Sequence, residues 1–202
     1  DVERYVQAIL YVAEELNIQR IVTCAGVYGE MPYDKERLVS AIYSKRELKP
    51  ELDKLSVNFS DYHGGASIGS YLCRRCGDVD RECVGLYAFI PTYDFSQVMQ
   101  QMGQGIRIEH DFGAWHGLLK RINYMLKTSF DLTEIEEKYE ELTATIAERI
   151  NELDAESPEA NIRAYVEQIG EGFEEVIFDP VGEVWEQEIE RLFNDDDDDD
   201  EA

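Results

Sequence analysis

One unbroken apolar run limits the folds that this chain can adopt. Residues 83–90 read Cys-Val-Gly-Leu-Tyr-Ala-Phe-Ile, and Pro91 follows directly. An apolar run of this length is typical of a strand that is buried on both faces of a sheet. We therefore expect residues 83–90 to form a buried strand, and we expect Pro91 to end it.

The residues before this run give the strand its context. Residues 55–59 resemble a short strand, residues 60–65 supply turn residues with adjacent glycines, and residues 66–75 have helical spacing. Ile68, Leu72 and Cys76 would lie on one face of that helix. A strand, a helix and a buried strand within about 35 residues predict a right-handed βαβ unit of a largely parallel sheet.

The flanking segments also alternate between helix and strand. Apolar residues recur at helical spacing over residues 1–16, a strand follows at residues 20–26, and an amphipathic helix begins at Phe112. Residues 38–43 fit either a helix or a strand with alternate side chains on one face. This alternation predicts the α/β class.

Charge is distributed unevenly along the chain, whose formal net charge is −25. Residues 131–202 carry 27 acidic and 4 basic side chains, whereas residues 1–130 carry 17 and 15. Nucleic acids and anionic membranes both bind cationic surfaces, so this distribution argues against either of them as a partner. It favours basic partners.

The acidic part has strong helical periodicity. Thr133 and Glu136 fit a capping box, in which each side chain satisfies the other residue's exposed backbone donor at the start of a long helix. We expect an α/β body over residues 1–130, a helical appendage over residues 131–193 and a disordered acidic tail over residues 194–202.

The sequence also bears on the cellular setting. No stretch approaches the roughly 20 apolar residues of a membrane span, and no signal peptide is recognisable. Four cysteines without the pattern of a small disulfide-rich domain indicate a reducing, cytoplasmic setting. The chain starts at Asp1 inside a helical pattern, and we expect an N-terminal part of the domain to precede it.

The turn after residues 55–59 is the first candidate for a ligand site. Open α/β sheets place ligands at the carboxyl ends of strands, and a helix N-terminus can hold an anion. The candidate ligand-binding residues are Asp61, His63, Gly64, Gly65 and Gly69. The segment has neither the Gly-x-Gly-x-x-Gly pattern nor the Lys-Ser/Thr pair of a P-loop. The alternative is a tight turn, with Gly69 allowing close helix–strand packing.

Other reactive side chains give weaker patterns. Cys73, Cys76 and Cys83 lack the second pair of ligands that a structural zinc site usually has, so buried reduced thiols are the favoured alternative and no metal or other cofactor is expected. Residues 109–111 (Glu-His-Asp) offer acid–base groups on a loop, or simply the solvated start of the next helix. No Gly-x-Ser-x-Gly elbow is present, and no catalytic residue is assigned.

Several segments together resemble the family of the second proteasome assembly chaperone. The resemblance extends over about residues 1–169. The segments that carry it are Ile-Val-Thr-Cys-Ala-Gly at residues 21–26, Met31-Pro32, Tyr-His-Gly-Gly at residues 62–65, Pro91-Thr92-Tyr93 after the buried strand, and the helical part from Thr133.

The resemblance implies a three-layer α/β/α sandwich, similar to that of nucleoside phosphorylases, with a helical appendage. Relatives act in proteasome assembly through protein–protein contacts, so the implied partners are further copies of the chain and proteasome-like subunits. Some prokaryotic members are grouped with ATP-grasp proteins, but no ATP-grasp signature is present. Archaeal relatives can end in a hydrophobic-Tyr-x docking motif, whereas this chain ends Asp-Glu-Ala.

Two functional hypotheses follow. The first is a cytoplasmic interaction protein of chaperone type that works as a homo-oligomer, because the helices carry long apolar seams and no catalytic constellation is visible. The alternative is a nucleotide- or small-ligand-binding enzyme that uses the glycine loop after residues 55–59.

Overall fold

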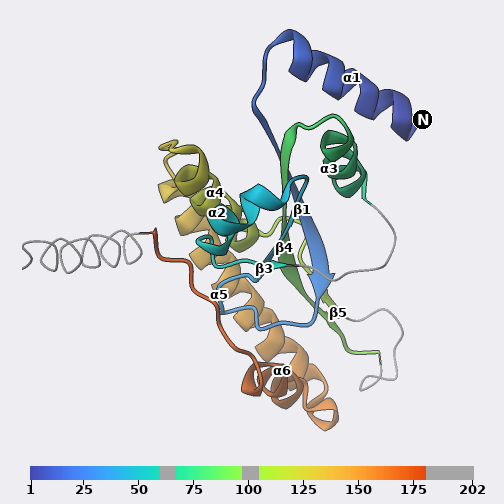
Figure 1. The fold of residues 1–202 in the computed structure, drawn as a ribbon. Helices are drawn as coiled ribbons and strands as arrows, with labels where there is room; N and C mark the ends of the chain where they lie inside the picture. The colour runs from blue at the N-terminus through green and yellow to red at the C-terminus, as the bar shows by residue number, and fades with distance from the viewer. Residues whose placement is uncertain (60–66, 97–104, 181–202) are drawn as a thin grey trace, which may run out of the picture.

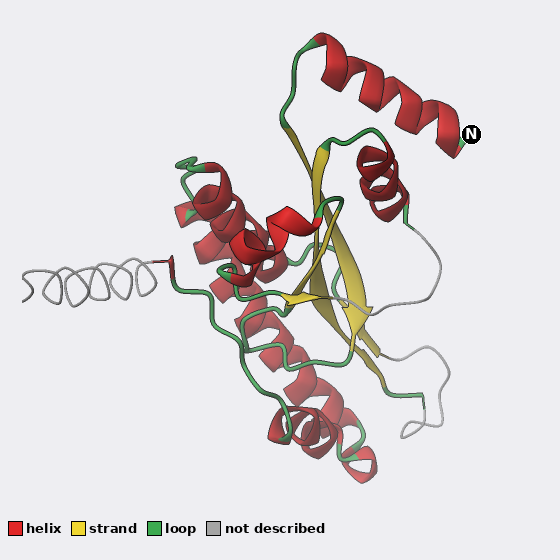
Figure 2. Cartoon of the chain, in the orientation of Figure 1, coloured by secondary structure: helices red, strands yellow, loops and turns green. Residues whose placement is uncertain are grey.

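The computed structural model describes residues 1–59, 67–96 and 105–180. A central sheet separates helices on its two faces (Figure 1), and Figure 2 shows this sheet in yellow between the red helices. The strands are β1 (Arg20–Gly29), β2 (Val39–Tyr43), β3 (Asn58–Phe59), β4 (Glu82–Asp94) and β5 (Gly105–Arg107). The α-helices are α1 (Val2–Glu15), α2 (Lys49–Asp53), α3 (Ile68–Asp78), α4 (Phe112–Leu126), α5 (Thr133–Glu156) and α6 (Ile162–Glu171). Short 3-10 turns are η1 (Arg46–Leu48) and η2 (Pro158–Ala160).

The predicted buried strand is confirmed as β4, which lies between β1 and β2 in the order β1-β4-β2-β3. The prediction that Pro91 ends the strand is wrong, because β4 continues to Asp94. Pro91 lies opposite Gly29, the last residue of β1, and beyond this point β4 pairs with β5 instead. The missing N–H of proline therefore falls where β4 changes its partner.

The predicted βαβ unit is also wrong in its strand pairing. β3 runs parallel to β2, and β2 runs antiparallel to β4, so β3 and β4 point in opposite directions and are not neighbours. The parallel neighbour of β4 is β1, which lies much earlier in the chain. Residues 38–43, which fitted either element, form β2, and this strand occupies the position beside β4 that β3 would need.

The sheet is covered on both faces, so the predicted three-layer α/β/α arrangement is confirmed. On one face, α1 and α3 enclose a small core that includes Val6, Leu72 and Cys83. On the other, α4 and α2 cover a larger core that includes Leu52, Leu86 and Leu118. Each core takes alternate residues of β4, as the two-residue period of a strand requires.

Some finer helix predictions need correction. Leu72 is buried in α3 as predicted, but Ile68, the first residue of α3, is 49% exposed. The capping box is wrong, because Thr133 donates its backbone N–H and its hydroxyl to Asp131 Oδ1 at 3.0 and 2.7 Å. Thr133 is the first residue of α5 and Leu132 is the N-cap, so the threonine does not occupy the capping position, and the Asp131 carboxylate satisfies its backbone N–H instead.

The C-terminal helices share a core with the sheet. The seam of α5 buries Ile146, Ile150 and Leu153, which pack with Tyr93 and Phe95 at the end of β4. Helix α6 completes this cluster, and both helices lie beside the lower end of the sheet in Figure 1. The predicted tail at residues 194–202 lies outside the described residues, and the division at residue 130 stays a prediction.

Helix α4 offers a matched pair of glycines for testing this packing. A Cβ atom on Gly113 would lie 2.6 Å from the ring of Tyr139 in α5, whereas one on Gly117 would meet Arg121 Nη1 at 3.4 Å, an ordinary contact. We predict that Gly113→Ala lowers the free energy of unfolding by about 1–3 kcal/mol through overpacking. Gly117→Ala should leave it unchanged or raise it by up to about 1 kcal/mol, because alanine favours helix. Urea unfolding followed by circular dichroism measures both, and equal effects would contradict the α4–α5 contact.

Candidate interaction site

Of the five predicted ligand-binding residues, Gly69 lies within the described part of the chain. Gly69 lies in the first turn of α3, where an added Cβ atom would come within 3.1 Å of Thr23 Oγ1 and 3.2 Å of the Tyr87 hydroxyl. Gly69 therefore allows α3 to approach β1 and β4 closely, which is the packing role considered for it. The other candidates lie outside the described residues and stay predictions: Asp61, His63, Gly64 and Gly65.

Hydroxyl groups gather at the N-terminus of α3. Ser67 caps the helix by accepting the Ser70 backbone N–H at 3.1 Å, and its Oγ lies 3.1 Å from the Tyr87 hydroxyl. The Oγ1 atom of Thr23 is inaccessible to solvent and has no hydrogen-bond partner within the described residues. A buried hydroxyl without a partner is unfavourable, and a polar ligand atom would gain a bond here only where the contact between α3 and β1 opens to admit it.

The three cysteines considered as metal ligands form one thiol cluster. Cys73, Cys76 and Cys83 are buried free thiols between α3 and β4. Hydrogen bonding to Cys73 and Cys76, together with burial, raises the pKa of the Cys83 thiol. Cys83 thus stays protonated at neutral pH, which suits a packing role because metals and electrophiles take the thiolate.

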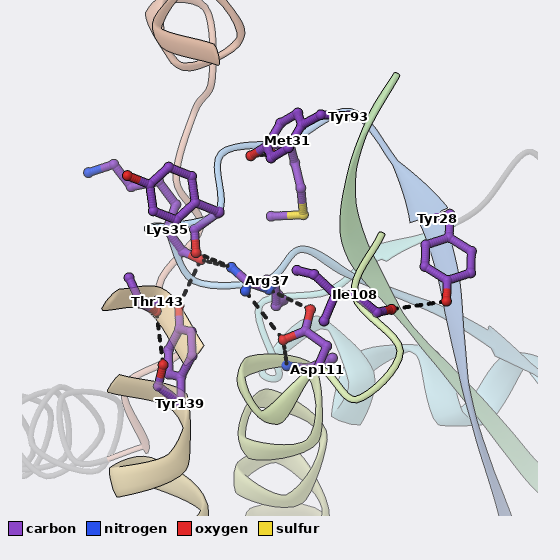
Figure 3. Close-up of polar contacts among 11 residues, drawn as sticks. Tyr28, Met31, Lys35, Arg37, Tyr93, Ile108, Asp111, Tyr139 and Thr143 are labelled. Atoms are coloured by element: carbon purple, nitrogen blue, oxygen red, sulfur yellow. Dashed lines mark hydrogen bonds and ion pairs between the residues drawn. The ribbon is translucent and has the colours of Figure 1, made fainter. Parts of the chain in front are cut away.

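A buried ion pair fixes the loop formed by residues 30–38, which we call the β1–β2 loop. Arg37 and Asp111 are both fully buried, and Arg37 donates from Nε and Nη2 to the two carboxylate oxygens at 2.8 and 3.2 Å. Arg37 Nη1 also donates to the carbonyls of Tyr33 and Lys35 in its own loop at 2.9 and 2.8 Å (Figure 3). Asp111 further caps α4 by accepting the Ala114 N–H. Of the three acid–base candidates at residues 109–111, Asp111 is therefore committed to structure, whereas Glu109 and His110 are exposed.

Tyrosines from three other elements bind the same loop. The Tyr93 hydroxyl of β4 donates to the Met31 carbonyl at 2.7 Å, and the Tyr139 hydroxyl of α5 donates to the Lys35 carbonyl at 3.0 Å. Tyr165 of α6 donates to the Glu30 carboxylate at 3.0 Å. Burial raises the pKa of Tyr93 and of Tyr139, so both remain donors across the neutral range.

The segment after α6 returns to the body and is held beside the same loop. Phe178 is fully buried in the core on the α4 face, with the Arg121 guanidinium 4.9 Å from its ring centroid. Arg121 is itself fully buried, donates to the Leu55 carbonyl at 2.9 Å and lies 3.5 Å from Glu36. Lys35 pairs with Glu175 at 3.3 Å. The loop therefore joins the sheet, the helical pair and the C-terminal segment.

This arrangement leaves a groove of about 550 Å³ between the β1–β2 loop and helices α5 and α6. Its apolar lining comes from both sides, and consists of Pro32, Tyr33, Ala147, Ile150 and Val166. A concave, partly apolar surface between elements distant in sequence is the usual form of a binding site. We regard this groove, named here the loop–helix groove, as the candidate functional site.

The rim of the loop–helix groove carries unequal charges. Its acidic side chains are Asp34, Glu167 and Glu171, and the carboxylates have no hydrogen bond or ion pair within the described residues. Its basic side chains are occupied, since Lys35 pairs with Glu175 and Arg163 Nη2 donates to Asn151 Oδ1 at 2.6 Å. The groove thus offers free acceptors beside an apolar floor, which favours a partner with cationic and apolar side chains.

A shallower hollow of about 370 Å³ lies between β5 and α5. Its lining includes Ile106, Ile108, His110, Leu142 and Arg149. Neither cavity was predictable from local sequence patterns, because each is formed by residues more than one element apart. The sequence signal for these cavities was the apolar seam of α5, which is longer than the neighbouring helix α6 can cover.

Comparison with known proteins agrees with the fold. A model of the PAC2 family matches residues 1–150. A comparison with curated proteins finds no match. Within the described residues, no helix is long and apolar enough to cross a membrane.

Solved structures give the same picture. A PAC2 family protein from Streptomyces avermitilis MA is 20% identical with a TM-score of 0.62, over 77% of this chain and 60% of that one. A proteasome-assembly chaperone homologue from Mycobacterium tuberculosis is 17% identical with a TM-score of 0.58, over 74% of this chain and 57% of that one. PbaA from Pyrococcus furiosus, an archaeal homologue of a proteasome-assembly chaperone, is 16% identical with a TM-score of 0.56, over 81% of this chain and 62% of that one. The chain spans less than two thirds of each, and these identities show a shared fold alone.

The buried ion pair beneath the groove gives a direct test of its importance. We predict that Asp111→Ala lowers the free energy of unfolding by about 3–5 kcal/mol, because it leaves Arg37 charged and unpaired in the interior. Glu109→Ala, which removes an exposed carboxylate close by, should change it by no more than about 0.5 kcal/mol. Chemical unfolding compares the two variants.

A double-mutant cycle tests the pairing itself. Arg37→Met combined with Asp111→Ala should lower the free energy of unfolding by less than the sum of the two single changes, and additive effects would contradict the pairing.

Proposed function

The chain belongs to the PAC2 family, and from this premise we propose that it acts through protein–protein contacts as an assembly or interaction factor. The proposal includes a homo-oligomeric state and a cytoplasmic location. Two of the similar solved structures are described as homologues of proteasome-assembly chaperones, which supports proteasome-like subunits as the class of partner.

The observation that carries the proposal is the loop–helix groove. Its floor is apolar, its free rim charges are acidic, and its two walls are fixed to each other by hydrogen bonds such as that from the Tyr139 hydroxyl to the Lys35 carbonyl. A preformed groove binds a partner segment without first paying the entropy of ordering its own walls. We therefore propose that it accepts a partner segment that carries lysine or arginine beside an apolar anchor.

The surrounding charge supports a basic partner. Residues 131–202, which include both helices of the groove, carry 27 acidic and 4 basic side chains. The basic side chains of the α/β body are largely engaged with nearby acids, for example Lys45 with Asp80 and Arg75 with Glu3. An acidic field of this kind attracts cationic partners and accelerates their association, with a strength that falls as salt is added.

A peptide titration tests the groove. The probe is a fluorescein-labelled amphipathic peptide of leucine and lysine, and fluorescence anisotropy gives its dissociation constant. We predict that Glu167→Lys weakens binding about three- to tenfold, because it replaces a rim attraction by a repulsion. The matched control is Glu148→Lys, an exposed reversal on α5 outside the groove, which should change binding less than about twofold at physiological salt.

Two results would count against the groove. One is equal weakening by Glu167→Lys and Glu148→Lys, which would indicate a general charge effect. The other is equal binding of a peptide in which every lysine is replaced by glutamate.

The N-terminus of α3 favours a second candidate function, the binding of a small anionic ligand by an enzyme or a sensor. The supporting observation is the unpartnered Oγ1 atom of Thr23 beside the Ser67 cap. For this function we predict that calorimetry detects the binding of ATP or inorganic phosphate to the chain. Thr23→Val should weaken that binding about tenfold, because it removes one hydrogen-bond partner of the ligand. Absence of heat with both ligands, or unchanged affinity in Thr23→Val, would rule it out.

A further inference from the structure

The segment after α6 crosses the molecule without regular secondary structure. We call residues 172–179 the strap, and Figure 1 shows it running from the end of α6 toward α4. Of these residues, all of which the structure describes, Phe178 alone is buried, and Ile177 beside it is 63% exposed. A segment that is held by one buried side chain belongs to the less stable parts of a fold and opens locally more often than the core.

The strap is attached to both walls of the loop–helix groove. It continues directly from α6, whose last residue, Glu171, lines the groove. At its other end it binds the β1–β2 loop. The Glu36 backbone N–H donates to Glu175 Oε1 at 2.9 Å, and the Phe178 N–H donates to Glu36 Oε1 at 3.5 Å. Lys35, which precedes Glu36, belongs to the groove lining.

The strap also holds the lysine of this lining. The Lys35 ammonium pairs with Glu175 Oε2 at 3.3 Å, and its side chain is 45% exposed. Lysine carries its charge on a flexible four-carbon stem, so the ammonium is free to take another carboxylate when Glu175 moves away. The same lining offers the free carboxylates of Asp34, Glu167 and Glu171.

We propose that the strap regulates the loop–helix groove by controlling Lys35, an inference that rests on the proposed function. With the strap docked, Glu175 holds Lys35, and the rim keeps its negative charge for a cationic partner. When the strap releases, Lys35 pairs with the rim acids and takes the place of the partner's lysine or arginine. The chain thus carries its own competitor, and Glu175 is a positioning residue that acts through Lys35. By linkage, a bound partner favours the docked strap by the same factor.

The anchor of the strap brings the docked and released states closer in free energy. The Phe178 ring lies against the Arg121 guanidinium, and burial lowers the pKa of that guanidinium. Release of the ring would expose Arg121 to water, and the regained hydration would offset part of the apolar contact that Phe178 loses. The strap therefore has the balance that a switch between two states needs.

Fluorescence anisotropy with the amphipathic peptide of leucine and lysine, the Leu/Lys peptide, tests this regulation. Low salt is used, because exposed charges then interact most strongly. We expect Glu175→Ala to weaken binding about two- to fivefold, because it frees Lys35. The matched control is Glu174→Ala, which removes an exposed carboxylate from the adjacent residue and should change binding less than about 1.5-fold.

A double-mutant cycle separates the role of Lys35 from a structural effect of the strap. Lys35→Met alone should bind the peptide at least as tightly as the unchanged chain, because its ammonium is already paired in the docked state. In the Lys35→Met background, Glu175→Ala should change the affinity less than about 1.5-fold, since the competitor is absent. Phe178→Ala, which removes the anchor, should weaken binding and be rescued by Lys35→Met in the same way, with folding checked by circular dichroism.

Two results would overturn the proposal. One is an equal effect of Glu174→Ala and Glu175→Ala, including no effect of either. The other is a loss of affinity in Glu175→Ala that persists in the Lys35→Met background. In both cases the unchanged chain still binds the peptide, so the groove keeps its proposed function and only the regulation is rejected. Failure of the unchanged chain to bind the peptide would reject the proposed function, and the regulation with it.

Discussion

The ion pair between Arg37 and Asp111 is the interaction on which the rest of the structure depends. Both side chains are fully buried, and such a pair is favourable only when hydrogen bonds satisfy the remaining polar atoms. Here the loop carbonyls of Tyr33 and Lys35 and the start of α4 provide those bonds. The pair therefore fixes the β1–β2 loop to α4, and the loop in turn accepts the tyrosine hydroxyls that hold the end of β4 and the helices α5 and α6.

The elements that local pattern determines were predictable from the sequence. The apolar run at residues 83–90 indicated β4, and helical spacing indicated α1, α4 and α5. Strand order was not predictable in the same way, because β2 and the distant β1 occupy the two sides of β4. Periodicity reports which face of a strand is buried, but it carries no information on the neighbour across the hydrogen bonds.

The candidate site was less accessible to sequence reasoning for a related reason. Arg37 lies among charged and loop-forming residues, Arg121 follows Lys120 in an amphipathic helix, and arginine is rarely fully buried, so the sequence predicted neither side chain to be buried. Their partners are far away in the chain, with Asp111 separated from Arg37 by 74 positions. The groove depends on these long-range pairs. The glycine turn, by contrast, has a recognisable local pattern. Within it, Gly69 lies against Thr23 and Tyr87 in the structure.

Backbone amide NMR during titration with the Leu/Lys peptide is the most direct test of groove binding. The groove predicts that the largest shift changes fall on amides of Tyr33, Val166 and Gly170, which come from both of its walls. Small changes at these positions, with the largest ones at the N-terminus of α3 around Ser67 and Gly69, would contradict it and favour the ligand-binding alternative.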